Sequence, residues 1–242
     1  MTRNLKVLGL ALAAMFALTA VAASAAQAVT PEYHCTSTSA NCFAESSASP
    51  ELTGNGKING SNDHVFNVNG GNVKCTGTTG VTDGAVLKGT AAKTSTSVTL
   101  TPTYAGCKAF GVKATVNPEG CTYTLTLVTG GISPYPITTD IKCPAGKKIT
   151  VTPTGLSCTI TVGEQTGLKG ITATNVGTEP THIEANINIT GANGKIAYTK
   201  TGTECPEGPG SGTNGTYTGH STITGFEDNS GTKGAKVGLH VF

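Results

Sequence analysis

The feature that most limits what this chain can fold into is a strict alternation of apolar and polar residues beside its cysteines. In the run CTYTLTL, alternate positions share one face of an extended chain and are held by Cys121, Tyr123, Leu125 and Leu127. Cys158, Ile160 and Val162 repeat the pattern further on. Alternation with a period of two, with Thr on the opposite face, is typical of a half-buried β-strand. The pattern predicts inward-facing cysteines in a disulfide-bonded β framework.

Short strand-like runs separated by turn signals continue to the end of the chain. Residues 64–75 predict a hairpin that turns at Asn69-Gly70-Gly71. Residues 110–128 predict a second hairpin, because Asn, Pro and Gly within 117–120 fit a type I turn. No segment after residue 28 has helical periodicity of useful length. We therefore predict an all-β fold, an antiparallel β-sandwich in one domain at 63–242, with two sub-domains dividing near residue 143 as the alternative.

The N-terminal residues 1–28 have the composition of a secretory signal peptide. Arg3 and Lys6 precede an apolar run that ends in small residues, and we expect cleavage after Ala28. An uncleaved anchor is the alternative, although a spanning helix needs about 20 apolar residues. Residues 29–62 are rich in Ser, Gly and Asn and are predicted to be a flexible segment. The expected localisation is secreted or extracellular, with cell-wall association open, and no membrane contact after cleavage.

The charge balance argues against nucleic acid as a partner. The chain has 16 Lys and Arg against 14 Asp and Glu, and the signal peptide holds two of the basic residues, so 14 of each sign remain. Arg3 is the only arginine, and the chain has no Trp. A nucleic-acid-binding protein shows a basic patch, and arginine is the usual ligand of phosphate.

Eight cysteines in an exported chain are expected to form four disulfides. The predicted structural cysteines are Cys35, Cys42, Cys75, Cys107, Cys121, Cys143, Cys158 and Cys205. Sequence does not choose among the many connectivities, so the pairing rests on proximity. Cys35–Cys42 would close a small loop and Cys143–Cys158 would join the ends of a predicted hairpin, which leaves Cys75–Cys107 and Cys121–Cys205.

No catalytic, cofactor-binding or metal-binding residue can be nominated from the sequence. The five histidines are scattered, whereas zinc sites need clustered ligands; they are His34, His64, His182, His220 and His240. The turn Glu227-Asp228-Asn229 is the nearest match to a calcium loop. There is no Gly-x-Ser-x-Gly nucleophile elbow, and the carboxylates are spread singly, so no glycosidase pair can be named.

Two further possibilities concern the strand surfaces. Thr is the commonest outward residue, which fits an ordinary exposed strand or a hydrogen-bonding face for sugar, wall polymer or ice. A Lys–Asn isopeptide crosslink is chemically conceivable, but no pair of residues can be named for it.

Six motifs resemble a family of secreted proteins from soil actinobacteria. They are GGNVKC, TPTYAGCKAFG, NPEGCTYT, IKCPAG, SCTITVGEQTGLKGIT and TNGTYTG. The likeness covers most of residues 63–225 and implies export and a disulfide-bonded β fold, and it transfers no catalytic residue. We therefore expect a secreted or wall-associated non-enzymatic β protein without a cofactor. The alternatives are a binding module for extracellular carbohydrate or wall polymer, and a secreted hydrolase.

Overall fold

The computed structural model describes residues 30–48, 51–52, 58–59, 63–76, 85–177, 182–190 and 195–242. The predicted signal peptide lies outside these residues. The described part is all-β: it contains no helix, and all its strand pairings are antiparallel. The all-β prediction is therefore confirmed.

Eight strands close into a barrel, which we call the first barrel. In order around the barrel they are β2 (Asn41–Ala48), β7 (Ala85–Ala92), β9 (Ser97–Tyr104), β12 (Thr122–Leu127), β13 (Tyr135–Lys142), β16 (Gln165–Val176), β17 (His182–Ile189) and β19 (Gly210–Asn229). The sheet closes because β19 pairs with β17 along one edge and with β2 along the other. The predicted plain sandwich is wrong, because alternation shows which face is buried and not which edge strands meet.

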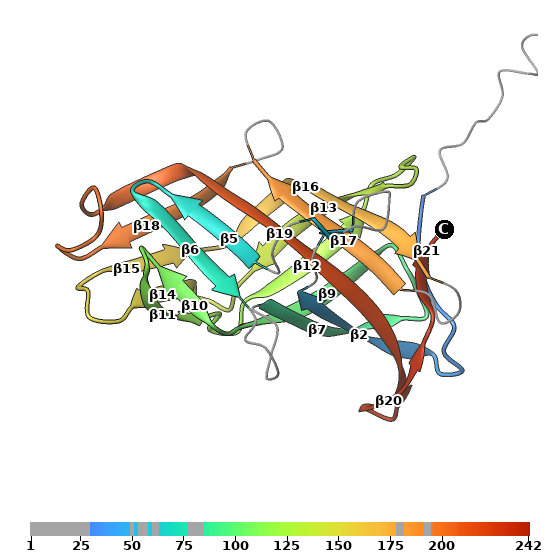
Figure 1. The fold of residues 1–242 in the computed structure, drawn as a ribbon. Coiled ribbons are helices and arrows are strands. Elements are labelled where there is room, and N and C mark those ends of the chain that lie inside the picture. Colours follow the sequence, from blue (N-terminus) through green and yellow to red (C-terminus); the bar gives the residue numbers. More distant parts are fainter. Residues whose placement is uncertain are drawn as a thin grey trace, which may run out of the picture.

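A second closed series of pairings, the second ring, uses the first part of the same strand β19. It runs through β5 (Asp63–Val68), β6 (Gly71–Thr76), β10 (Cys107–Ala109), β11 (Val112–Asn117), β14 (Ile149–Pro153), β15 (Thr159–Val162), β18 (Ile196–Thr201) and back to β19. In Figure 1 the second ring occupies the left half of the molecule and the first barrel the right half. The long strand β19 crosses from one to the other.

The remaining strands lie outside these two closed series of pairings. A small sheet consists of β21 (Leu239–Val241), β1 (Tyr33–Cys35) and β8 (Thr94–Ser95), in that order. Strand β20 (Thr232–Val237) pairs back onto β19, and β3 (Glu51–Leu52) pairs with β4 (Ile58–Asn59). The segment 29–62, expected to be flexible, thus contains β1 and the barrel strand β2. The domain boundary at residue 63 stays a prediction.

Two of the three predicted hairpins are confirmed, because β5 pairs with β6 and β14 pairs with β15, and one is wrong. Strands β5 and β6 pair through Val68 and Gly71, as expected. The turn after Asn117 forms, with the Asn117 side-chain oxygen accepting the backbone N–H of Glu119 at 3.0 Å. However, β11 pairs with β10 and β14, whereas β12 pairs with β9 and β13. The turn therefore carries the chain from the second ring into the first barrel.

The inward faces are those that the alternation predicts. Leu125, Leu127, Ile160 and Val162 are buried as expected, and the same alternation along β17 buries Ile183, Ala185, Ile187 and Ile189. Burying an aliphatic side chain of this size contributes about 1.5–3 kcal/mol. The interior of both halves is therefore mainly aliphatic, and the polar groups inside it stand out.

Candidate binding site in the barrel interior

Five polar side chains of the interior gather where the first barrel meets the second ring. They form what we call the partition: His64, Tyr104, Tyr123, Tyr217 and Ser221. They come from β5, β9, β12 and β19. Strand β19 leaves β5 after Thr218 and takes β2 as its partner from Ser221 onward. The partition fills the interior at this exchange of partners.

The backbone of β19 makes room for the imidazole. Tyr217, Gly219 and Ser221 alternate along β19 and so share its inward face. A Cβ added at Gly219 would lie 2.5 Å from His64 Nδ1, which is closer than atoms can approach. Glycine at this position is therefore what lets the His64 ring lie against the strand.

Hydrogen bonds connect the partition into one network. His64 Nδ1 lies 2.9 Å from the Tyr217 hydroxyl, and His64 Nε2 lies 3.2 Å from Ser221 Oγ. Tyr217 is hydrogen-bonded to Tyr104, whose hydroxyl lies 2.5 Å from that of Tyr123. A neutral imidazole has one donor and one acceptor nitrogen, so it can satisfy both of its neighbours without a charge.

Burial keeps these groups uncharged. Desolvation lowers the pKa of His64 from 6.5 to about 4, and the side chain is only 3% exposed. Burial also raises the pKa of Tyr123 to about 12 and places the pKa values of Tyr104 and Tyr217 well above their usual range. At neutral pH the partition is therefore a chain of neutral hydrogen-bonding groups.

A cavity lies on each side of the partition. The cavity in the first barrel measures about 80 Å³ and the one in the second ring about 60 Å³. Side chains that line both are His64, Tyr104, Tyr123, Ile141, Ile196 and Tyr217. The other walls are nearly all apolar, including Leu125, Leu168 and Ile171 in the larger cavity and Phe66, Val73 and Val151 in the smaller.

One hydroxyl that lines the larger cavity has no hydrogen-bond partner. The oxygen of Thr139, on β13, is buried and unpaired, and within the described ranges only the Tyr33 hydroxyl shares this condition. Leaving a buried polar group unsatisfied costs about 1–3 kcal/mol. A small molecule with a hydrogen-bonding group would remove this cost.

The contact between Ser221 and His64 resembles a nucleophile beside a base, but the rest of a catalytic triad is not in place. The imidazole nitrogen that a carboxylate would orient faces the Tyr217 hydroxyl instead. The neighbouring Asp63 binds Lys74 at 2.5 Å and also accepts from Thr76. The backbone of Ser221 lies within a strand paired with β17 and β2, which leaves no room for an oxyanion hole. The geometry fits a polar anchor better than a hydrolytic site.

All eight predicted cysteines are paired, and none is free. Cys35–Cys42 and Cys75–Cys107 form as expected. The other two predicted pairs are wrong, because the bonds are Cys121–Cys143 and Cys158–Cys205. Each of these joins the ends of neighbouring strands: Thr122 pairs with Lys142, and Thr159 pairs with Thr201. Strand neighbours, and not the shortest loop, decide the connectivity.

Four of the five histidines come together in two pairs outside the barrel interior. His34 lies directly across from His240 on β1 and β21. His182 and His220 flank Glu184, at 3.2 Å and 3.4 Å from its two carboxylate oxygens. Among the described residues, no group of three or more His, Cys, Asp or Glu is arranged to hold a metal ion.

The calcium candidate at residues 227–229 has its oxygens engaged in loop contacts. Glu227 accepts hydrogen bonds from Ser37 Oγ at 2.5 Å and from the backbone N–H of Thr38 at 3.0 Å, and the bond from Ser37 lowers the pKa of Glu227. Asp228 accepts from the backbone N–H of Gly231 at 2.7 Å. These carboxylates fasten the loop after β1 and the turn after β19.

The buried lysine that an isopeptide crosslink would need is Lys200, which is 4% exposed. Its Nζ donates to the backbone oxygens of Asn69, at 2.8 Å, and Pro206, at 2.5 Å. The side-chain oxygen of Asn69 accepts from Asn214 instead. The ammonium group thus ties two loops together through carbonyl oxygens.

Sequence reasoning missed the partition, although a signal for it was present. In TYTGHSTIT the inward positions carry Tyr, Gly and Ser where a simple core strand would carry aliphatic residues. Polar residues on an inward face need partners, and those partners come from strands far away in the sequence. Their identity could be read only from the fold.

Comparisons with protein-family models, with curated proteins and with solved structures found no match. No helix in the described part of the chain is long and apolar enough to cross a membrane. The resemblance to secreted actinobacterial proteins stays a prediction. The four disulfides are compatible with an extracellular location.

Proposed function

We propose that this chain is an exported, non-enzymatic binding protein that holds a small, mainly apolar molecule inside the first barrel. The observation that carries the proposal is the apolar cavity with the unpaired Thr139 hydroxyl on its wall. Ligand sites are typically apolar cavities with a few polar groups that fix orientation.

The volumes limit the size of the ligand. An apolar cavity of roughly 150 Å³ takes up benzene. The larger cavity, at about 80 Å³, matches a smaller molecule such as a short-chain alcohol. The two cavities together approach the benzene-sized volume, so a phenol would bind only if Tyr104 or Tyr123 moved aside.

The test is thermal unfolding of the protein with increasing concentrations of 1-propanol. Saturable binding at ten times the dissociation constant should raise Tm by roughly 3–6 °C. In Thr139→Val the shape is kept but the hydroxyl is lost, so the shift should shrink. In Ala185→Val the added methyl groups occupy part of the cavity that Ala185 lines, and the shift should disappear.

The Ala185→Val variant also separates binding from the general effect of alcohol on proteins, which it would leave unchanged. A Tm that only falls with alcohol in both proteins would contradict the proposal. Xenon uptake, which needs no hydroxyl, would then show whether the cavity accepts any guest.

Wall-polymer binding rests on the outward Thr side chains, such as Thr99 and Thr124, whose hydroxyls lie 3.1 Å apart across β9 and β12. Retention of the purified protein on cell walls, reversed by soluble sugar, would favour that function. A hydrolase would require turnover that is lost in Ser221→Ala.

A further inference from the structure

The two strands at the end of the first barrel place four outward side chains side by side. His34 on β1 pairs directly with His240 on β21. The next positions, Glu32 and Phe242, are joined by two backbone hydrogen bonds of 3.0 and 3.1 Å. We call Glu32, His34, His240 and Phe242 the terminal-strand cluster.

The backbone holds these side chains outward. Tyr33 and Val241, which alternate with them, are 3% and 1% exposed. Because successive side chains of a strand point to opposite faces, the cluster must face solvent. Strand β1 is further held by β8 on its other edge and by the Cys35–Cys42 disulfide at its end.

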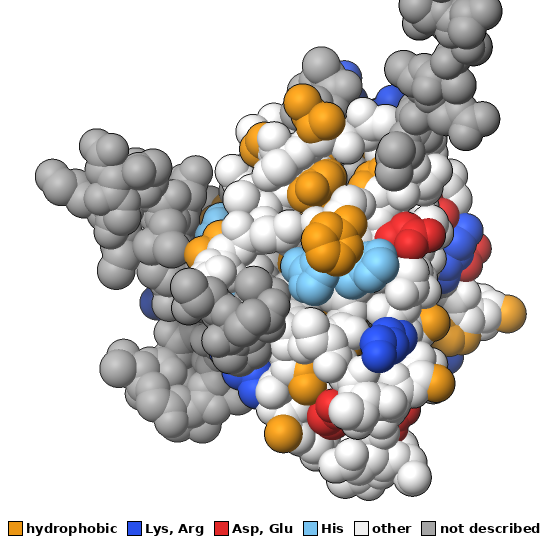
Figure 2. All heavy atoms as spheres, turned by 90° about the vertical axis from the view of Figure 1, so that its right-hand side faces the viewer, with side chains coloured by type: hydrophobic (Ala, Val, Ile, Leu, Met, Phe, Trp, Pro, Cys, Tyr) orange, Lys and Arg blue, Asp and Glu red, His pale blue; other side chains and the backbone are white. Residues whose placement is uncertain are grey.

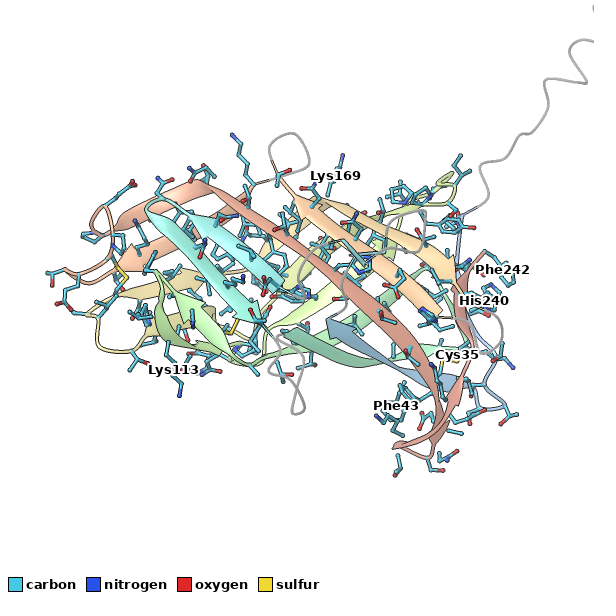
Figure 3. All side chains as sticks on the ribbon, in the orientation of Figure 1. Cys35, Phe43, Lys113, Lys169, His240 and Phe242 are labelled. Carbon is cyan, nitrogen blue, oxygen red and sulfur yellow. A yellow bond between two sulfur atoms is a disulfide. The ribbon has the colours of Figure 1, made fainter. Side chains whose placement is uncertain are left out.

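The two imidazoles lie close together and are nearly parallel. Their centroids are 5.9 Å apart, with 14° between the planes. The Phe242 ring packs edge-on against both, at 4.8 Å from His34 and 4.3 Å from His240. Figure 2 shows histidine and hydrophobic side chains grouped on this face, and Figure 3 labels His240 and Phe242 at its edge.

Glu32 supplies a carboxylate beside one imidazole, with its Oε2 lying 3.4 Å from His34 Nε2. Histidines that bind metals generally donate their other N–H to a carboxylate or carbonyl, which fixes the tautomer. With Nε2 turned to Glu32, the His34 nitrogen left for a metal is Nδ1.

We propose that His34 and His240 form a surface site for one divalent late transition-metal ion, namely Cu²⁺, Ni²⁺ or Zn²⁺. Imidazole nitrogen suits these ions. Each ring contributes one nitrogen after a small side-chain rotation, Glu32 orients His34, and water fills the remaining positions. Two protein ligands agree with the finding that no described group of three has metal-binding geometry.

The other histidine pair is a matched comparison. His182 and His220 face different oxygens of Glu184, and Thr222 donates to the same carboxylate at 2.7 Å. The carboxylate thus lies between the two imidazoles, and one nitrogen of each ring already faces it. In the terminal-strand cluster the Glu32 carboxylate faces His34, and the two imidazole rings stack on each other.

The experiment is calorimetric titration of the purified protein with Zn²⁺ and Ni²⁺ at pH 7.5, with circular dichroism to check folding. We expect one ion per chain. His34→Gln and His240→Gln should each weaken the affinity by at least about tenfold, and Glu32→Gln by about tenfold. The control His182→Gln/His220→Gln should leave the affinity unchanged.

Cu²⁺ electron paramagnetic resonance gives a second readout. The protein should show two coordinated nitrogens, and His240→Gln should show one. Binding should weaken with acid, because metal ligands must be deprotonated. Absence of saturable binding, or loss of affinity in the His182→Gln/His220→Gln control alone, would overturn the proposal.

Discussion

The first barrel and the second ring share β19, yet they close their ends and cross-link their strands differently. The far end of the first barrel is covered by a separate small sheet with apolar inward side chains. In the second ring, polar groups of its own strands and loops bond to one another: Tyr198 receives the Asn69 N–H at 2.8 Å, and Lys200 binds the Asn69 and Pro206 carbonyls. The end near Lys200 therefore depends on satisfied polar groups, whereas the first barrel depends on apolar contacts and keeps the larger cavity.

The disulfides also differ between the two halves, because those of the second ring close longer loops. The second-ring bonds Cys75–Cys107 and Cys158–Cys205 span 32 and 47 residues, against 7 and 22 for Cys35–Cys42 and Cys121–Cys143. Longer closed loops restrict the unfolded chain more. We expect the second ring to depend more than the first barrel on its disulfides for stability. Four experiments test the differences between the two halves.

The largest effect is expected from the longest loop. Cys158→Ser/Cys205→Ser should lower the free energy of unfolding by about 4 kcal/mol, and Cys35→Ser/Cys42→Ser by about 2 kcal/mol, because loop-closure entropy grows with loop length. Urea unfolding of both double variants measures the difference. A larger loss from the shorter loop would contradict a stronger dependence of the second ring on its disulfides.

The second prediction concerns His64, which belongs to both halves. Its pKa is lowered from 6.5 to about 4, so the unfolded chain binds a proton first as pH falls. Stability is then complete above pH 6.5 and is lost progressively down to pH 4, by about 3 kcal/mol. His64→Gln removes this titration. Urea unfolding at pH 7 and pH 4 should show a smaller pH dependence in the variant, and an equal dependence would contradict the assignment.

The third prediction uses a pair of glycines. A Cβ at Gly219 would meet His64 at 2.5 Å, whereas a Cβ at Gly163 has no neighbour within 4 Å. Gly219→Ala should destabilise the protein by about 1–3 kcal/mol through overpacking of the partition. Gly163→Ala should stay within about 0.5 kcal/mol of the parent. Equal Tm values for the two variants would show that the partition accommodates an added methyl group without loss of stability.

The smallest effects are expected from the removal of single tyrosine hydroxyls, one in the second ring and one in the partition. Tyr198→Phe removes two hydrogen bonds, the one that its hydroxyl accepts from the Asn69 N–H and the one that it donates to Asn214, and should cost about 2 kcal/mol. Tyr123→Phe removes the hydrogen bond between Tyr123 and Tyr104, while Tyr104 keeps its bond with Tyr217. This change should cost about 1 kcal/mol. Chemical unfolding measures both losses in free energy. A larger loss in Tyr123→Phe than in Tyr198→Phe would mean that the hydrogen bonds of the partition contribute more to stability.

Two turns show that the sequence predicts turn formation well and strand pairing less well. At Asn69-Gly70 the local signal predicted both the turn and the pairing of β5 with β6, because the partners are adjacent in sequence. At 117–120 the same kind of signal predicted the turn correctly, yet the strands on either side pair with others. Turn chemistry is set by three or four residues, while pairing depends on every competing edge.

The candidate sites follow the same division. The cysteines and their inward direction were readable from alternation, but two of the four pairs depend on which strands are neighbours. The partition joins His64 to Tyr217 and Ser221, and the terminal-strand cluster joins His34 to His240. No local pattern links residues so far apart along the chain.

By itself the sequence determined an all-β protein, its inward faces and a full set of cystines, because side-chain alternation is a local property of each strand. Only the tertiary structure decided that the sheet closes around β19 and where the cavities and histidine pairs lie. The physical reason is that closure depends on backbone hydrogen bonds between distant edges, and these bonds are nearly independent of side-chain identity.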